Sequence, residues 1–161
     1  VEWGPLRFLI MDTPREHNLH LYIKEMKNNN VTDVVRVCEK AYSAAEVEKA
    51  GIRMHEMEFD DGDSPPGGII TDWLHLVDET FKGVKEGNPS SPAIAVHCVA
   101  GLGRAPVLVA IACIERGADP LHIVKYIRNR RRGAINAKQL MYLENYAATV
   151  SQGCLSYCTI C

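Results

Sequence analysis

The chain has 161 residues, of which 47% are hydrophobic and 24% are charged, and its formal net charge is −2. This composition is typical of a soluble globular domain, and the small charge predicts no bulk attraction to nucleic acid or to a membrane. No apolar run approaches the length that spans a bilayer, and the first residues do not resemble a signal peptide. We therefore expect synthesis in the cytosol, where the six cysteines should be mostly free thiols.

The hydrophobic pattern predicts strands that alternate with helices and are followed by helices alone. The predicted strands cover residues 6–10, 31–37, 52–59 and 93–96. The predicted helices cover 18–27, 43–51 (with Ser43 and Glu46 as a capping box), a segment capped by Asp72 that reaches Val84, a segment from Pro106 to Gly117, and segments that begin at Asp119 and Asn136. We predict one α/β domain over residues 1–150, with a central, largely parallel sheet flanked by helices, and a cysteine-rich tail over 151–161.

The strongest chemical signal is the segment that follows the strand at 93–96. The strand runs without a spacer into Cys98, then through two glycines to Arg104 and to Pro106, which is expected at the first position of a helix. The N-terminus of a helix binds anions and favours the thiolate form of a cysteine, and a guanidinium can hold two oxygens of a tetrahedral anion. The alternative is a structural cysteine buried on a strand-to-helix turn. The predicted phosphate-binding loop consists of Val99, Ala100, Gly101, Leu102, Gly103 and Arg104.

The sequence Val-His-Cys-Val-Ala-Gly-Leu-Gly-Arg-Ala-Pro-Val-Leu-Val-Ala at 96–110 resembles the signature of the phosphatases of regenerating liver (PRL). These are small prenylated members of the cysteine-based protein tyrosine phosphatases. Segments at 35–39, 59–62, 130–134 and 138–144 resemble PRL segments in the same order, so the resemblance covers about residues 7–146. It implies the tyrosine and dual-specificity phosphatase fold, Cys98 as nucleophile, Arg104 as phosphate clamp, and no metal or cofactor.

A phosphatase of this kind also needs a proton donor, because the leaving tyrosine oxygen has a pKa of about 10. Asp60 and Asp61 lie on a loop rich in Gly and Pro, and the resemblance implies that Asp61 is the general acid. Without the cysteine loop, this Asp-Asp-Gly run would indicate an ordinary turn. PRLs usually have Trp-Pro directly before the Phe that precedes these two acids. Here Met57-Glu58 occupies those positions, so closure of the acid loop is expected to differ.

The chemistry expected from these residues is transfer of the phosphoryl group to Cys98, followed by hydrolysis of the phosphocysteine. Most cysteine phosphatases have Ser or Thr after the loop arginine, and Ala105 cannot donate the corresponding hydrogen bond to the leaving sulfur. Slow turnover is therefore expected. The loop lacks the lysines typical of phosphoinositide phosphatases, which favours phosphotyrosine, with dual specificity left open.

Two further features are interpreted through the PRL resemblance. The resemblance places Cys38 beside Cys98, as a partner that would trap the oxidised nucleophile in a disulfide. The arginines at 128, 130, 131 and 132 form a basic face, which is usually a solvated helix end but can also steer the protein toward acidic lipids or phosphopeptides.

The tail, Cys-Leu-Ser-Tyr-Cys-Thr-Ile-Cys at 154–161, has three interpretations. The Cys-x3-Cys-x2-Cys spacing is that of the radical-SAM iron–sulfur motif, but that motif does not suit a position after a complete phosphatase domain. A zinc site would need a fourth ligand, and none lies nearby in the sequence. The remaining interpretation is a CaaX box prenylated on Cys158, which would place the protein peripherally at plasma or endosomal membranes.

Two rival functions use the same loop. PRLs bind cyclin-M magnesium transporters, so the domain could act chiefly as an interaction module that docks its phosphate pocket on such a transporter. An arsenate reductase or sulfurtransferase would also need the thiolate loop, but the aspartate loop disfavours both.

Overall fold

A mixed five-stranded sheet forms the centre of the computed structural model, which describes the backbone of residues 1–156 and the side chains of residues 1–146. The strands are β1 (Glu2–Trp3), β2 (Leu6–Met11), β3 (Val31–Arg36), β4 (Arg53–Glu56) and β5 (Ala93–His97), in the order β1-β2-β5-β3-β4. The neighbouring strands β2, β5, β3 and β4 are parallel to one another, and β1 runs antiparallel to its neighbour β2. The largely parallel α/β sheet predicted from the sequence is confirmed, and β1 is an addition to it.

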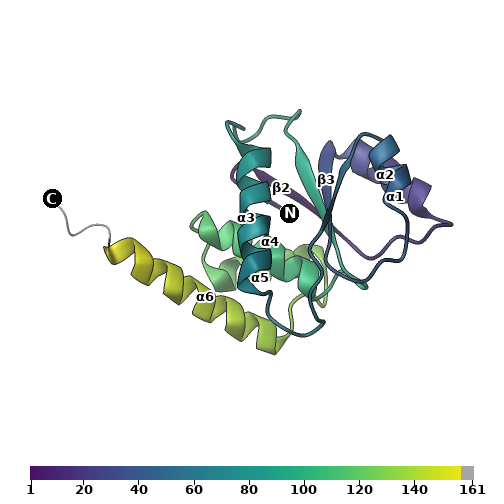
Figure 1. The fold of residues 1–161 in the computed structure, drawn as a ribbon. Helices are drawn as coiled ribbons and strands as arrows, with labels where there is room; N and C mark the ends of the chain where they lie inside the picture. Colours follow the sequence, from purple (N-terminus) through teal and green to yellow (C-terminus); the bar gives the residue numbers. More distant parts are fainter. Residues whose placement is uncertain (157–161) are drawn as a thin grey trace.

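Helices cover both faces of the sheet (Figure 1). They are α1 (Leu19–Asn28), α2 (Ala45–Lys49), α3 (Gly67–Phe81), α4 (Arg104–Glu115), α5 (Pro120–Arg130) and α6 (Ala137–Ser156). The period of two along the strands divides the core: Val34 and Ala95 pack in the cluster with α1 and α2, whereas Val35 and Val96 pack in the cluster with α3 to α6. This division explains why β5 reads as an almost continuous apolar run, since both of its faces are buried.

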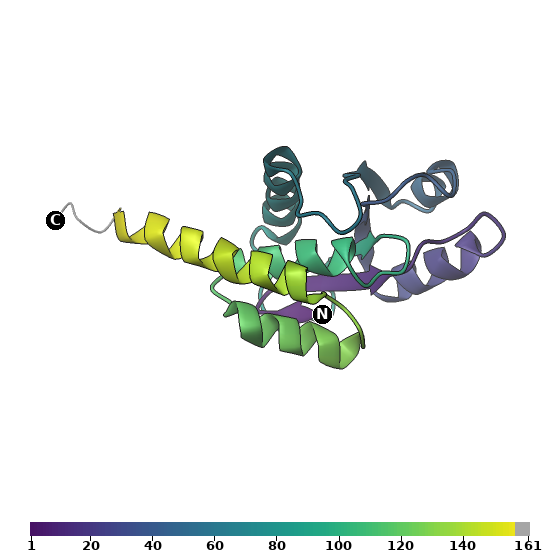
Figure 2. The same ribbon diagram turned by 90° about the horizontal axis from the view of Figure 1, so that it is seen from below.

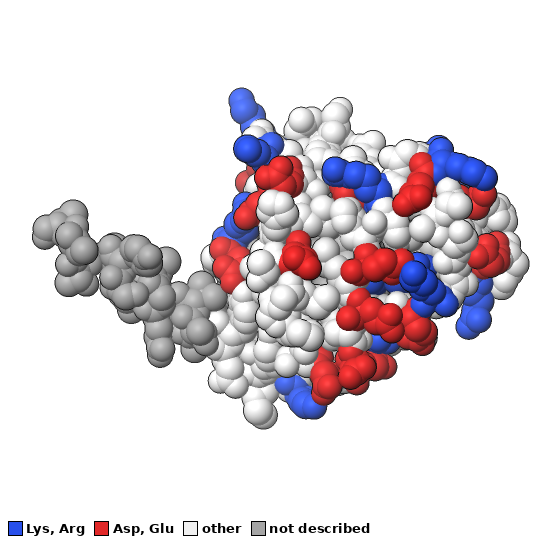
Figure 3. All heavy atoms as spheres, in the orientation of Figure 1, with Lys and Arg blue, Asp and Glu red and all other residues white. Residues whose placement is uncertain are grey.

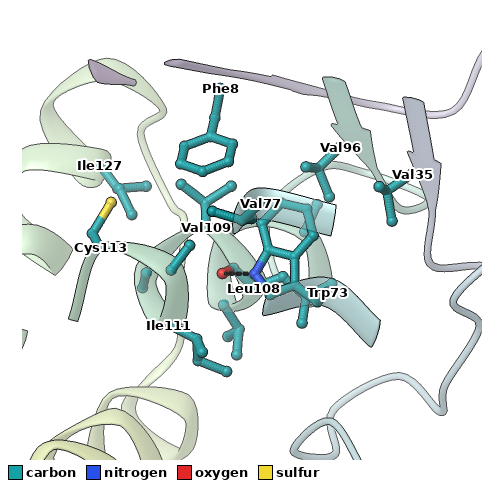
Figure 4. Close-up of a cluster of buried hydrophobic side chains, with 14 of the residues drawn as sticks. Phe8, Val35, Trp73, Val77, Val96, Leu108, Val109, Ile111, Cys113 and Ile127 are labelled. Carbon is teal, nitrogen blue, oxygen red and sulfur yellow. Dashed lines mark hydrogen bonds between the residues drawn. The ribbon is translucent and has the colours of Figure 1, made fainter. Parts of the chain in front are cut away.

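Helix α4 lies at the centre of the larger cluster, and all of its residues from Arg104 to Ile114 are buried. A helix that is apolar around its whole circumference can only be stable in such a position. Figure 4 shows Trp73 of α3 packed against this helix, with its indole Nε1 donating a hydrogen bond of 2.7 Å to the carbonyl oxygen of Leu108. The beginning of α4, which carries the end of the predicted phosphate loop, is therefore held rigidly by the core.

The structure corrects several predicted element boundaries. Helix α3 begins at Gly67 rather than at Asp72, because Pro66 in an extended conformation already turns the chain and because Ile69 and Ile70 pack against the core; the helix also ends before Val84. Strand β4 ends at Glu56 rather than Phe59. Helix α4 starts at Arg104, so Pro106 is its third residue, where a missing N–H still costs nothing.

The predicted capping box at Ser43 is wrong in both halves, because the N-cap of α2 is Ala44 and no side chain caps the helix. The Ser43 Oγ accepts a hydrogen bond from the Ala45 N–H, but the Ser43 N–H donates to Glu16 instead of Glu46. Glu46 pairs with Lys49 at 3.0 Å. A carboxylate distant in sequence thus replaces the local partner.

Helix α6 continues past residue 150 and extends away from the rest of the domain (Figure 2). Among the residues that the structure describes, no helix is both long and apolar enough to span a bilayer. Cys158, the predicted prenylation site, lies outside the described residues.

Candidate active site

Three of the predicted site residues, Cys38, Asp61 and Cys98, follow the carboxyl ends of neighbouring parallel strands, where ligands bind in sheets of this type. Cys38 follows the end of β3, Asp61 lies in the loop after β4, and Cys98 follows β5 directly. Cys38 and Cys98 are free and buried, with 1% and 3% of their surface exposed. Asp61 is 76% exposed.

The loop after Cys98 turns four successive carbonyl groups outward. Each of these carbonyls accepts a hydrogen bond from a donor outside the loop, and the donors come from the segment after β2 and from the connection between α5 and α6. Because a trans peptide directs its C=O and the following N–H to opposite sides, the N–H groups of residues 100–103 are left to face the other side, as an anion cradle requires. The four bonds are Thr13 N to Val99 O (3.0 Å), Arg131 Nη2 to Ala100 O (2.9 Å), Arg131 Nε to Gly101 O (2.6 Å) and Ile135 N to Leu102 O (2.8 Å).

Gly101 is required by this shape. Its φ is +68°, and a Cβ at this position would lie less than 3.0 Å from the backbone carbonyl of Met11 and from the guanidinium of Arg131. Any side chain would therefore meet both the left-handed strain and a backbone group that cannot move aside.

Arg104 is buried, with 5% exposure, and is fixed by backbone acceptors. Its Nη1 donates to the carbonyl oxygen of Phe59 at 3.0 Å and lies 3.4 Å from that of Val37. Its Nε has no hydrogen-bond partner among the described residues, although Asp61 Oδ1 lies 3.5 Å away as an ion-pair contact. Buried donors are nearly always satisfied, so this Nε marks a place for an acceptor that belongs to a ligand.

Gln139, which the sequence analysis did not single out, also borders the loop. Its side chain is buried, and its Nε2 would lie 3.2 Å from a Cβ on Gly103. It is held by a reciprocal cap with Asn136: the Asn136 N–H donates to Gln139 Oε1 and the Gln139 N–H donates to Asn136 Oδ1, at 3.0 and 2.8 Å. The spacing of Asn136 and Gln139 is a capping-box pattern that the sequence already contained.

Behind Cys98 lies a buried polar network that sequence reasoning also missed. His97 is completely buried; its Nε2 lies 2.7 Å from the Tyr42 hydroxyl, and its Nδ1 lies 3.4 Å from the Cys98 carbonyl and 4.0 Å from Cys38 Sγ. Burial lowers the pKa of His97 to about 4, so the imidazole is neutral at pH 7. Tyr42 in turn faces the guanidinium of Arg36, 4.6 Å from the ring centroid.

Cys38 and Cys98 therefore share His97 as a neighbour. Burial raises the pKa of the Cys38 thiol, and charge on the nearby Cys98 acts in the same direction. The disulfide between them that the resemblance implies stays a prediction. In the structure both cysteines are free.

Arg128 and Arg131 of the predicted basic face bond to backbone carbonyls within the molecule, whereas Arg130 and Arg132 are exposed. Arg128 donates to the carbonyls of Ala134 and Ile135, Arg130 stacks 3.6 Å over the Tyr126 ring, and Arg131 holds the loop. Figure 3 shows acidic and basic side chains intermixed on the face seen there, with no continuous basic surface. The steering role of residues 128–132 toward acidic lipids or phosphopeptides stays a prediction.

Comparison with known proteins places this site among phosphatases. Residues 11–118 match the family described as polymorphic toxin system, DSP-PTPase phosphatase. The chain is 49% identical to the probable protein tyrosine phosphatase type IVA A of Dictyostelium discoideum, over 96% of this chain and 90% of that protein. It is 47% identical to the PRL-1 phosphatase of Drosophila melanogaster, over 91% and 80% of the two chains.

Solved structures agree with these sequence relatives. A protein tyrosine phosphatase from Leishmania major superposes with a TM-score of 0.72 at 41% identity, and the match covers 85% of each chain. The identities and the coverage of these relatives lead to one assignment. This chain belongs to the protein tyrosine phosphatase type IVA family, the PRL phosphatases.

Proposed function

We propose that the protein is a cysteine-dependent phosphatase that hydrolyses phosphotyrosine through a phosphocysteine on Cys98. The observation that carries this proposal is the buried Nε of Arg104, which has no hydrogen-bond partner among the described residues, beside a loop whose N–H groups face away from four bonded carbonyls. A tetrahedral dianion would supply the acceptors that these donors lack. The family membership supports the same chemistry.

In the first step of the proposed reaction, the Cys98 sulfur attacks phosphorus and the bond between phosphorus and the tyrosine oxygen breaks. The carboxyl group of Asp61 gives its proton to the departing oxygen. Asp61 Oδ1 lies 3.5 Å from Arg104 Nε, and its high exposure leaves it free to withdraw when phosphate enters. The contact supports a role for the acid loop at this site although Met57-Glu58 replaces the usual Trp-Pro.

In the second step, water attacks phosphorus, the Asp61 carboxylate takes a proton from that water, and the sulfur leaves as thiolate. Ala105 is fully buried next to Arg104 and offers no hydroxyl to the leaving sulfur. Hydrolysis of the phosphocysteine is therefore the slow step of the proposed cycle.

The test is hydrolysis of a phosphotyrosine peptide by the wild type, Cys98→Ser, Asp61→Asn and Asp60→Asn. We expect Cys98→Ser to be inactive and Asp61→Asn to lose about 10²-fold or more in the first step, the usual contribution of a positioned acid. Asp60→Asn is the matched control, because it removes the adjacent carboxylate. Equal losses in the two aspartate variants would contradict the role of Asp61, and full activity of Cys98→Ser would contradict the proposal as a whole.

The apolar rim of the loop favours a second candidate function. Val99 and Leu102 are 45% and 37% exposed, although both belong to the phosphate loop. An exposed apolar rim around an anion site suits docking on a protein partner, such as a cyclin-M magnesium transporter. Binding of such a transporter by Cys98→Ser, with loss of binding in Leu102→Asp, would support this candidate; unchanged binding in Leu102→Asp would exclude the rim as the docking surface.

A further inference from the structure

Arg131 makes two hydrogen bonds to the phosphate loop, and neither has a role in the proposed chemical steps. It lies in the connection that follows α5, and its guanidinium is directed onto the back of the phosphate loop rather than into solvent. Nε donates to the Gly101 carbonyl at 2.6 Å and Nη2 donates to the Ala100 carbonyl at 2.9 Å. One planar fork thus fixes two consecutive peptide groups of the loop.

These two peptides are the ones most free to change orientation. Gly101 has a positive φ, and glycine populates both signs of φ at similar cost. If the carbonyls of Ala100 and Gly101 rotated, they would direct oxygen lone pairs toward the anion in place of N–H donors. The guanidinium opposes this rotation because each carbonyl would lose a charge-assisted hydrogen bond.

The backbone beside Arg131 shows strain that serves the same contact. Ile135 is buried and has a φ of +60°, an uncommon conformation for a β-branched residue. In this conformation its N–H donates to the Leu102 carbonyl at 2.8 Å, while its own carbonyl accepts from Arg128. Strain of this kind persists only where the surroundings enforce it, and it concentrates at functional sites.

We propose that Arg131 is a positioning residue that holds the phosphate loop in its anion-binding shape by clamping the carbonyls of Ala100 and Gly101. The inference rests on the proposed function only in that the ligand is a phosphate group. The bonds that Arg131 makes to the loop go to the carbonyls of Ala100 and Gly101, so it acts on phosphate binding through the loop backbone. Its effect is to determine which side of the loop presents donors.

The experiment measures the dissociation constant of inorganic phosphate by calorimetry, which requires no turnover. The variants are Arg131→Gln, Arg131→Lys and the control Arg130→Gln, which removes the same charge from a side chain stacked on Tyr126. We expect Arg131→Gln to weaken phosphate binding about 10- to 100-fold, the range for loss of one hydrogen bond involving a charged group. Arg130→Gln should change it less than about threefold, as expected for a surface charge.

Arg131→Lys keeps the positive charge but removes the planar guanidinium, so it separates the effect of geometry from that of charge. It also serves as the second variant if Arg131→Gln does not fold. A lysine ammonium is a point donor and does not span both carbonyls, so most of the weakening should remain. Thermal unfolding of each variant shows that binding is measured on folded protein. Full recovery of binding in Arg131→Lys, or equal effects of Arg131→Gln and Arg130→Gln, would overturn the proposal. Wild-type protein that binds phosphate without hydrolysing phosphotyrosine would refute the proposed function alone, and wild-type protein that binds no phosphate would refute both.

Discussion

Acidification should destabilise the fold through His97, the buried residue that precedes the nucleophile. Its pKa falls from 6.5 to about 4 on folding, because burial disfavours the charged imidazolium. Between these two pH values the unfolded chain binds a proton that the folded chain does not, so stability rises with pH. The contribution is fully present above pH 6.5 and is lost as the pH falls toward 4. From pH 7 to pH 5 the expected loss is about 2 kcal/mol, at about 1.4 kcal/mol per pH unit.

Urea unfolding at pH 7 and pH 5 measures this loss. In His97→Gln the free energy of unfolding should be lower at pH 7, since the contact with Tyr42 is altered, but its change between the two pH values should shrink by about 2 kcal/mol. His20→Gln is the control, because it removes an imidazole that is exposed instead of buried. An equal pH dependence in His97→Gln and the wild type would refute the reasoning.

Three other substitutions test the site. Gly101→Ala should lower the free energy of unfolding by at least about 2 kcal/mol, because the left-handed backbone is strained for Ala and the Cβ overpacks against Met11. Gly83→Ala is the control, at φ +71° with open space around it, and should cost only about 1–2 kcal/mol. Similar unfolding energies for the two variants would contradict the close approach to Met11. Ala105→Ser should raise steady-state turnover about tenfold or more, because the serine hydroxyl donates a hydrogen bond to the leaving thiolate. If the wild type shows no burst of product and the variant shows no increase in turnover, hydrolysis of the phosphocysteine is not limiting. Cys38→Ser should prevent recovery of activity by dithiothreitol after mild peroxide, because no disulfide then protects Cys98 from further oxidation; unchanged recovery would remove Cys38 as the partner.

The parts of the fold that follow from local pattern could be predicted from the sequence. The runs that became β2, β3 and β5 carry their own periodicity, and Asp119 and Asn136 cap α5 and α6 as their spacing indicates. The glycines and arginine after Cys98 identified the anion loop, because that chemistry uses residues adjacent in sequence.

What could not be predicted depends on contacts between distant residues. The start of α3 is set by packing of Ile69 and Ile70 rather than by a capping side chain. Arg131 looked like one of several basic residues, and its partners lie 30 and 31 positions away. The contact between Tyr42 and His97 joins residues 55 positions apart, so no spacing rule could reveal it.

The clamp on the phosphate loop also gives the protein an order of maturation. Cys98 and its loop leave the ribosome before Arg131 and Ile135, the residues that bond to three of the loop's carbonyls. During that interval the nascent chain carries the cysteine without the donors that shape its surroundings. Under the proposal that Arg131 shapes the loop, phosphate binding appears late in synthesis, when the connection between α5 and α6 docks. A chain truncated before residue 131 is expected to carry an ordinary thiol that binds no phosphate.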